Sequence, residues 1–192
     1  ENVASIGGEL SLASPLLSNW LAWMHAHHPT LALNVDVAPM AQLLERVRDG
    51  SIDLAVLYDP PSQPGLTGEL LVDEKLVMVT TSKTRAPSPE DYVHVDWGPA
   101  FNENLRAAFP ELANAAVTSS LGPLALAYVL KVGGSGYFRS QVAKPFLDSK
   151  QLRLAPNAPA FSYSIRAVYA TDSDSELIAT MRSGLRACVE QG

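Results

Sequence analysis

The stretch that decides the fold is residues 31–58, which read LALNVDV, then APMAQLLERVRDG, then SIDLAVLY. Two apolar runs rich in β-branched residues flank a segment in which Leu43, Leu44 and Val47 recur with helical spacing. Gly50 follows the last apolar residue of that segment and predicts the end of the helix. Strand, helix and strand with short connections predict a right-handed βαβ unit whose two strands are parallel.

The turns that follow those two strands mark the edge where a ligand is expected. Parallel sheets are covered on both faces, so their ligands bind beyond the carboxyl ends of the strands. In this unit those ends are the turns at residues 37–40 and 58–60.

A strand and a helix precede this unit. Residues 6–13 have a strand-like pattern that the pair Gly7-Gly8 weakens at its start. Ser14 and Pro15 form a helix start signal, an N-cap residue followed by proline at the first helical position. The apolar face of this helix is formed by Leu17, Trp20, Leu21 and Met24.

The rest of the chain repeats the alternation of strands and helices. Residues 68–81 hold two strand-like runs, and the polar, proline-bearing residues 82–91 are typical of a linker between lobes. A second β/α pattern begins at Tyr92, and Ser173 with Glu176 forms a capping box for the last helix. We therefore expect two α/β lobes, with about three helix–strand alternations in each.

Composition excludes several classes of protein. The chain carries 14 Lys and Arg against 20 Asp and Glu, a net charge of −6, without a basic cluster, so we expect this piece not to contact DNA. Its single cysteine, Cys188, excludes an intrachain disulfide and is interpreted as a small residue on an amphipathic helix. No apolar run reaches the ~18 to 20 residues of a membrane span. The start of the chain has no charged-then-apolar signal segment, and because it begins at Glu1 without an initiator Met we expect a processed chain or an excised fragment.

Several stretches are similar to one known family. They are the SPLL helix start, a helix that ends at His28-Pro29, and above all LERVRDGSIDLAV at residues 44–56. Residues 124–138, LALAYVLKVGGSGYF, add a helix followed by a Gly-x-Gly turn into a strand, whereas residues 92–120 match no general pattern. In element order the whole chain resembles the regulatory, effector-binding domain of LysR-type bacterial transcription regulators.

This resemblance implies a two-lobe α/β fold like that of type 2 periplasmic binding proteins, with two crossing strands between the lobes and an effector in the cleft. Lobe I would comprise residues 1–81 and 171–192, and lobe II residues 82–170, with crossings at residues 77–81 and 167–170. The resemblance also implies an upstream winged helix-turn-helix DNA-binding domain, absent from this chain, and a cytoplasmic homodimer or tetramer. Its subunits would pair the first helix and second strand of one with the second lobe of another.

Candidate effector contacts in lobe I lie at the starts of two helices. The helix N-terminus at Ser14 suits a carboxylate or another anion, although plain N-capping explains the same pattern without a ligand. Met40 follows Pro39 at a position where the similar LysR-type regulators tend to carry a small hydroxyl residue. This departure makes the second subsite more apolar and weakens the expectation of a strongly anionic effector.

Candidate contacts in lobe II follow its strands. Asp96 could accept hydrogen bonds from a ligand and Trp97 could stack on a ring; alternatively, Asp96 caps the next helix and Trp97 belongs to the core. Ser119, Ser120 and Gly122 precede a helix and predict a second site of N–H donors, with capping again as the alternative.

The glycine-rich turn at residues 133–136 is not a phosphate loop, because a helix precedes it and a strand follows, so we interpret it as a helix C-cap. Arg139, just beyond, could reach a carboxylate in the cleft or form a surface ion pair, and Pro145 is expected to close the next turn. The complete set of candidate effector-binding residues is Ser14, Pro15, Leu16, Pro39, Met40, Asp96, Trp97, Gly98, Ser119, Ser120, Gly122, Phe138 and Arg139.

The first helix also carries candidates for a subunit contact. Trp23 lies off the apolar face, so Trp20, Trp23 and His27 are expected at a dimer interface, with a half-exposed aromatic on a monomer as the alternative. His25 and His28 share a helix face, but no nearby Cys, Asp or Glu completes a metal site. The sequence has no nucleophile elbow and no paired carboxylates in a defined spacing, so we expect no metal, no cofactor and no catalysis.

The sequence therefore predicts the small-molecule-sensing domain of a LysR-type regulator. A periplasmic solute-binding protein of a transporter shares the architecture and is the main alternative. An enzyme on the same two-lobe fold, such as a relative of prephenate dehydratase or deaminase, is a second alternative. Neither the identity nor the charge of the effector has a signature in the sequence.

Overall fold

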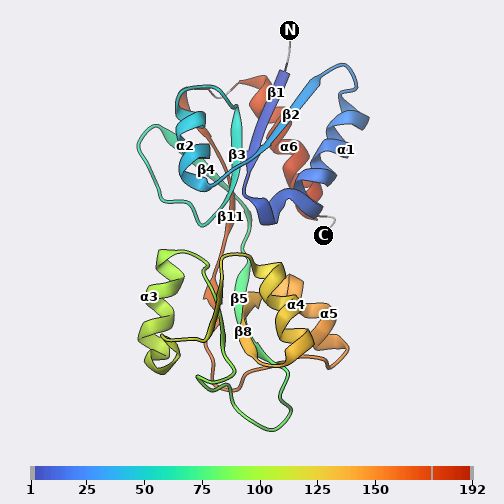
Figure 1. The fold of residues 1–192 in the computed structure, drawn as a ribbon. Helices are drawn as coiled ribbons and strands as arrows, with labels where there is room; N and C mark the ends of the chain where they lie inside the picture. Colours follow the sequence, from blue (N-terminus) through green and yellow to red (C-terminus); the bar gives the residue numbers. More distant parts are fainter. Residues whose placement is uncertain (1–2, 174, 191–192) are drawn as a thin grey trace. The chain divides into compact units, whose positions relative to one another are not determined.

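The chain forms two units and passes between them twice. In the computed structural model, which describes residues 3–173 and 175–190, unit 1 comprises Glu1–Asp73 and Ser164–Gly192, and unit 2 comprises Glu74–Tyr163 (Figure 1). Both units combine strands and helices, so the predicted α/β class is confirmed.

The boundaries between the units differ from the predicted ones. The structure divides at residues 73/74 and 163/164, not at 81/82 and 170/171. The reason is that β5 (Lys75–Thr80) pairs with strands of unit 2 over its whole length, and β11 (Ile165–Ala170) with strands of unit 1. Residues 82–91, predicted as a linker between lobes, therefore lie inside unit 2.

Unit 1 is built on a five-stranded sheet. Its order is β2-β1-β3-β11-β4, where β1 pairs in parallel with both β2 and β3, and β11 is antiparallel to β3 and β4. The βαβ prediction is confirmed, with β1 inserted between the two strands that α2 connects. The further elements of this sheet and its connection are β1 (Val3–Gly8), β2 (Ala32–Val37), α2 (Met40–Arg48), β3 (Leu54–Tyr58) and β4 (Leu66–Val72).

The glycine pair of β1 lies under packed side chains. A Cβ on Gly7 would lie 2.5 Å from Leu43 Cδ2, and one on Gly8 would lie 2.6 Å from Leu17 Cδ1. These glycines let α2 and the segment before α1 approach the strand. The strand β1 ends at Gly8, and a 3₁₀ helix follows at Leu10–Leu12. The observed strand therefore begins and ends earlier than the predicted strand at residues 6–13.

Two further helices complete unit 1. The indole Nε1 of Trp20, on α1 (Ser18–His27), donates to the carbonyl of Met181 on α6 (Glu176–Glu190) at 3.0 Å. The α6 cap also differs from the predicted capping box, because the hydroxyl of Ser175 accepts from the N–H of Ile178 at 3.2 Å. Cys188 is buried on α6 as expected, and burial raises the pKa of its thiol.

Unit 2 has a central strand, β5, with antiparallel neighbours on both sides. β8 (Ser135–Arg139) pairs with one edge of β5, and the short β9 (Arg153–Leu154) and β10 (Phe161–Ser162) also pair with β5. β6 (Val93–Val95) and β7 (Val117–Ser119) form a parallel pair, which a bridge between Tyr92 and Ser135 joins to β8. The helices of this unit are α3 (Pro99–Ala108), α4 (Gly122–Val132) and α5 (Ser140–Asp148).

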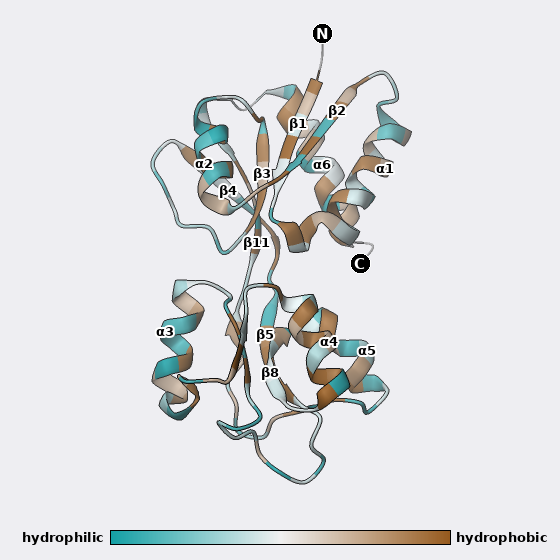
Figure 2. Cartoon of the chain, viewed as in Figure 1, coloured by the Kyte–Doolittle hydropathy of each residue, from teal (hydrophilic) through white to brown (hydrophobic). Residues whose placement is uncertain are grey.

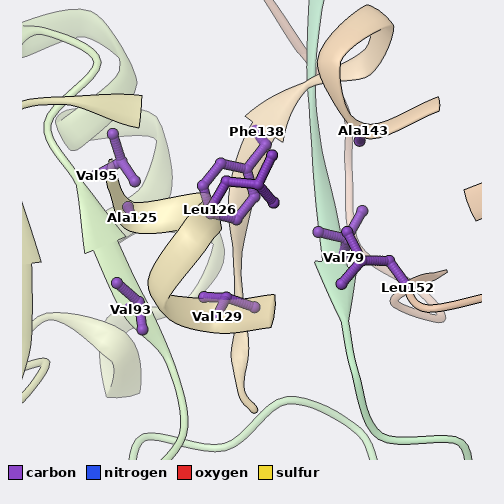
Figure 3. Close-up of a cluster of buried hydrophobic side chains, with 9 residues drawn as sticks. All are labelled: Val79, Val93, Val95, Ala125, Leu126, Val129, Phe138, Ala143 and Leu152. Carbon is purple, nitrogen blue, oxygen red and sulfur yellow. The ribbon is translucent and has the colours of Figure 1, made fainter. Parts of the chain in front are cut away.

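The core of unit 2 lies between these strands and helices. α4 is hydrophobic along most of its length (Figure 2), and its side chains meet those of β6 and β8 (Figure 3). Pro145, predicted to close a turn, lies inside α5 instead. The buried Ala143 and the partly buried Phe146 and Leu147 of α5 pack against the core, and this packing holds the helix despite the proline. Figure 3 shows Val79, Val93, Val95, Ala125, Leu126, Val129, Phe138, Ala143 and Leu152.

Among the described residues, none of the helices has both the length and the apolar character that crossing a bilayer would require.

Candidate functional site

In unit 1 the predicted residues follow the carboxyl ends of parallel strands, and Ser14 lies at a kink in a distorted helical turn before α1, which begins at Ser18. The backbone of Ser14 is extended (φ −138°, ψ 130°), as it is in N-cap residues, and its peptide bond to Pro15 is cis, whereas Leu17, which directly precedes α1, provides no side-chain cap. The hydroxyl of Ser18 instead donates to the carbonyl of Pro15 at 3.0 Å. Ser14 and Pro15 are exposed and Leu16 is half-buried, so this segment presents surface to a ligand without being a regular helix N-terminus.

The second predicted subsite of unit 1 is the start of α2. Pro39 precedes the helix and is exposed, whereas Met40 is half-buried and packs against the cluster around Leu43. The structure thus places an apolar side chain at this helix start, as the sequence predicted.

Sequence reasoning missed Glu9, which lies at the same edge of the sheet. The N–H of Tyr58, at the carboxyl end of β3, donates to Glu9 Oε2 at 2.7 Å. Burial raises the pKa of the Glu9 carboxyl, and this hydrogen bond opposes the shift in part. A carboxylate right after β1 carries no local motif, so only the strand order identifies it.

In unit 2 the carboxyl ends of β6 and β7 are tied together. The N–H of Asp96 donates to the carbonyl of Ser119 at 2.9 Å. Asp96 Oδ1 accepts from the N–H of Gly98 at 3.0 Å and from Asn102 Nδ2 at 2.9 Å. Asp96 therefore fixes the turn before α3, whose N-cap residue is Gly98, without capping the helix itself, and its side chain stays exposed.

A chain of polar side chains continues from Asp96 along the same face of β6. Asn102 Oδ1 lies 3.1 Å from His94 Nε2, and His94 Nδ1 lies 3.4 Å from the hydroxyl of Tyr92. Burial lowers the pKa of His94, so its imidazole is neutral and accepts from one neighbour while donating to the other. No local motif identifies Asn102 or His94, because their roles depend on the packing of α3 beside β6.

Trp97 is a packing residue as well as a candidate contact. Its indole Nε1 donates to the carbonyl of Tyr137 at 2.9 Å, and its ring meets Tyr163 edge-on at 5.2 Å. A Cβ on Gly122 would lie 2.4 Å from Trp97 Cη2, which explains the glycine at the start of α4. The core alternative for Trp97 thus accounts for most of its surroundings, although the side chain is only partly buried.

The two serines before α4 differ. The hydroxyl of Ser119 accepts from the N–H of Leu121 at 3.0 Å, a local turn of the backbone, whereas Ser120 is exposed. Ser120 is therefore the better placed of the two for a ligand.

Arg139 is engaged within unit 2. Its Nη2 lies 3.5 Å from Glu74 Oε2, and Glu74, only 2% exposed, also accepts from the hydroxyl of Ser140 at 2.6 Å. Arg139 thus forms a partly buried ion pair rather than the surface pair considered from sequence. Phe138 is 1% exposed in the core, so the expectation that its side chain contacts an effector is wrong.

Of the three residues predicted at a subunit contact, one is buried inside unit 1 and two are accessible at its surface. Trp20 is fully buried between α1 and α6, so its assignment to a dimer interface is wrong. Trp23 is half-buried and stacks on the exposed His27 at 4.0 Å, and both stay predicted interface residues. Within the part of the chain that the structure describes, no group of three His, Cys, Asp or Glu could hold a metal ion.

Comparisons with known proteins agree on one family. Residues 3–189 match the family model described as LysR substrate binding domain. The chain is 24% identical over 106 residues to the HTH-type transcriptional regulator HdfR of Escherichia coli O139:H28, and equally to those of Shigella boydii and Escherichia fergusonii. These alignments cover 54% of this chain and 38% of each relative, so the matched part is well under half the length of these regulators.

Solved structures share the fold over the full length of the chain. The regulatory domain of HypT from Salmonella typhimurium aligns with a TM-score of 0.79 at 14% identity, covering 100% of this chain and 97% of that one. A cysteine-to-serine variant of the OxyR2 regulatory domain from Vibrio vulnificus aligns with a TM-score of 0.73 at 16% identity, covering 99% and 96%. The chain belongs to the LysR substrate binding domain family and has its fold, which is like that of type 2 periplasmic binding proteins.

Proposed function

We propose that this chain is the effector-sensing domain of a LysR-type transcription regulator. The observation that carries this proposal is the family match over residues 3–189. The full-length protein would be a cytoplasmic homodimer or tetramer that binds DNA through an upstream winged helix-turn-helix domain. The net charge of −6 supports this division of labour, because a chain with this charge is a poor partner for phosphates.

The effector would contact the residues that follow the parallel strands of each unit. In unit 1 these are Ser14, Met40 and the partly buried Glu9; in unit 2 they are Asp96 and Ser120. Such a set offers two carboxylates, two hydroxyls and one apolar side chain. It favours a small polar molecule that donates hydrogen bonds and has an apolar part.

An anion is a poorer fit for these residues. Among the structural neighbours, one HypT regulatory domain is described as bromide-bound and one OxyR2 domain as sulfate-bound. In unit 2 the predicted cation, Arg139, is already paired with the buried Glu74. An effector carboxylate would have to compete with that pair.

Sensing requires that the ligand bind one arrangement of the protein more tightly than another. The effector would shift the equilibrium between two arrangements of the DNA-binding domains by its differential affinity for them. In the family this is the step that links the ligand to transcription.

The test uses the full-length regulator and a panel of amino acids, organic acids and nucleosides. A compound that raises the melting temperature of the protein is then assayed for its effect on binding to the DNA upstream of the gene. We expect Asp96→Asn and Ser120→Ala each to weaken the binding of that compound by about tenfold, because each variant loses one hydrogen bond to the ligand. Ser62→Ala, an exposed serine in another loop, is the matched control. Equal effects of all three variants would contradict the assignment of the site.

A further inference from the structure

Unit 2 contains a cavity at the opposite end of β6 and β7 from the predicted effector residues. Its volume is about 400 Å³, within the range of small-molecule sites. It lies against Val93 and Val117, the first residues of the two strands, whereas Asp96 and Ser119 are at or beyond the last. It is therefore separate from the site described above.

The loop of residues 81–91 forms one wall of the cavity and is held in place by hydrogen bonds. The guanidinium of Arg153 donates to the carbonyls of Ser82 and Arg85. At the other end of the loop, Asp91 Oδ1 accepts from the N–H of Ser88 and from the hydroxyl of Ser135, each at 3.1 Å. The wall is thus preformed, which lowers the entropy lost when a ligand binds.

The turn Gly133-Gly134 forms another wall, and it does not bind phosphate. The N–H of Gly133 donates to the carbonyl of Val129 at 2.8 Å, and that of Gly134 to the hydroxyl of Thr81 at 2.9 Å. Both donors that a phosphate would need are therefore occupied. A Cβ on Gly134, whose φ is +139°, would lie 2.6 Å from the carbonyl oxygen of Asp91, so the glycine serves the close approach of the two segments.

The remaining walls combine one apolar side with charges of both signs. Tyr128 and Val132, 37% and 63% exposed on the last turns of α4, provide apolar surface beside Val117. Among the described residues that line the cavity, Arg85 carries the one positive charge, and Glu90 and Asp91 carry negative charges. A purely anionic ligand would be repelled by the two carboxylates, and a purely cationic one would leave the Arg85 guanidinium without a partner.

We propose that this cavity is a second ligand site, which takes an α-amino acid with an apolar or aromatic side chain. The ligand carboxylate would pair with Arg85, its ammonium group with Glu90, and its side chain would lie on Tyr128 and Val132. This site does not depend on the effector site and would be occupied in its presence or absence.

The experiment is isothermal titration calorimetry of the 192-residue chain with L-phenylalanine. Two analogues serve as probes of charge: 3-phenylpropionate lacks the ammonium group, and phenethylamine lacks the carboxylate. We expect L-phenylalanine to bind, and both analogues to bind about tenfold more weakly or not at all, because each leaves one charged side chain unpaired.

Variants locate the binding. Arg85→Gln and Tyr128→Ala should each weaken the binding of L-phenylalanine by about tenfold. Lys83 is an exposed cation that does not line the cavity, so Lys83→Gln should leave this affinity unchanged. No heat of binding with L-phenylalanine and L-leucine at millimolar concentration would overturn the proposal. Loss of binding in Asp96→Asn but not in Arg85→Gln would also overturn it, by placing the amino acid at the effector site and leaving the proposed function intact.

Discussion

At the scale of single residues, Glu9 combines a partly buried carboxylate with a position at the edge of the unit 1 sheet. Burial destabilises the charged form of this carboxyl, and the hydrogen bond from the N–H of Tyr58 stabilises that form and offsets part of the effect. Groups with shifted pKa values gather at functional sites, which is a reason to include Glu9 among the effector contacts.

The raised pKa of Glu9 makes the stability of the chain depend on pH. Since the folded state binds this proton more tightly than the unfolded state, stability falls as pH rises from the ordinary value of 4.5 through the folded pKa. Glu9→Gln keeps an acceptor for the N–H of Tyr58 and removes the charge. We expect it to raise the free energy of unfolding at pH 7 and to change it little at pH 4, as measured by urea denaturation. Glu111→Gln, an exposed glutamate in unit 2, is the control for loss of one charge; an equal effect of the two would contradict the prediction.

The ion pair between Glu74 and Arg139 makes a second prediction at this scale. Arg139→Met would leave the Glu74 carboxylate, 2% exposed, without its guanidinium, and we expect a loss of about 3 kcal/mol in the free energy of unfolding. The double variant with Glu74→Gln should recover most of that loss, because the charge is then gone. Denaturation of the four proteins of this cycle measures the coupling, and a double variant that loses the sum of the two single losses would contradict it.

At the scale of elements, the sequence predicted best where the periodicity was local. The alternation of residues 31–58 specified β2, α2 and β3, and the glycine after α2 specified where the helix ends. It failed where the deciding partner is distant in sequence. Residues 82–91 have the composition of a linker, yet the guanidinium of Arg153 and the side chain of Asp91 fix them inside unit 2.

The helix α5 shows the same limit. Pro145 predicts a turn from local rules, whereas the core of unit 2 holds the segment helical around it. Pro145→Ala should therefore restore one backbone donor and raise the free energy of unfolding by about 1 to 2 kcal/mol. Pro99→Ala, at the first position of α3 where proline is compatible, should bring no such gain. A Pro145→Ala variant that is less stable than the parent in thermal denaturation would contradict this explanation.

The candidate site was only partly visible in the sequence for a related reason. Strand ends and helix starts located Asp96 and Ser120, since these follow from the order of elements. Asn102, which holds Asp96, and Glu74, which holds Arg139, were invisible, because each acts across a tertiary contact. Phe138 was misassigned because its strand, β8, lies next to the central β5 and buries it.

At the scale of the whole molecule, the proposed function makes this chain one part of a longer regulator. The 106 aligned residues cover 38% of the length of the curated relatives. We propose that DNA binding belongs to another domain of the full-length protein, because this chain carries a net charge of −6. The half-buried Trp23, which stacks on the exposed His27, stays the predicted contact between subunits.

The intact mass and the cellular location of the endogenous protein distinguish a transcription regulator from a solute-binding protein. Immunoprecipitation from fractionated host cells, followed by mass spectrometry, gives both. If the proposed function is right, the endogenous protein is cytoplasmic and its mass exceeds that of this chain by a small, basic N-terminal domain. A protein of about 20.6 kDa recovered from the periplasm would contradict the account and would assign the chain to solute transport.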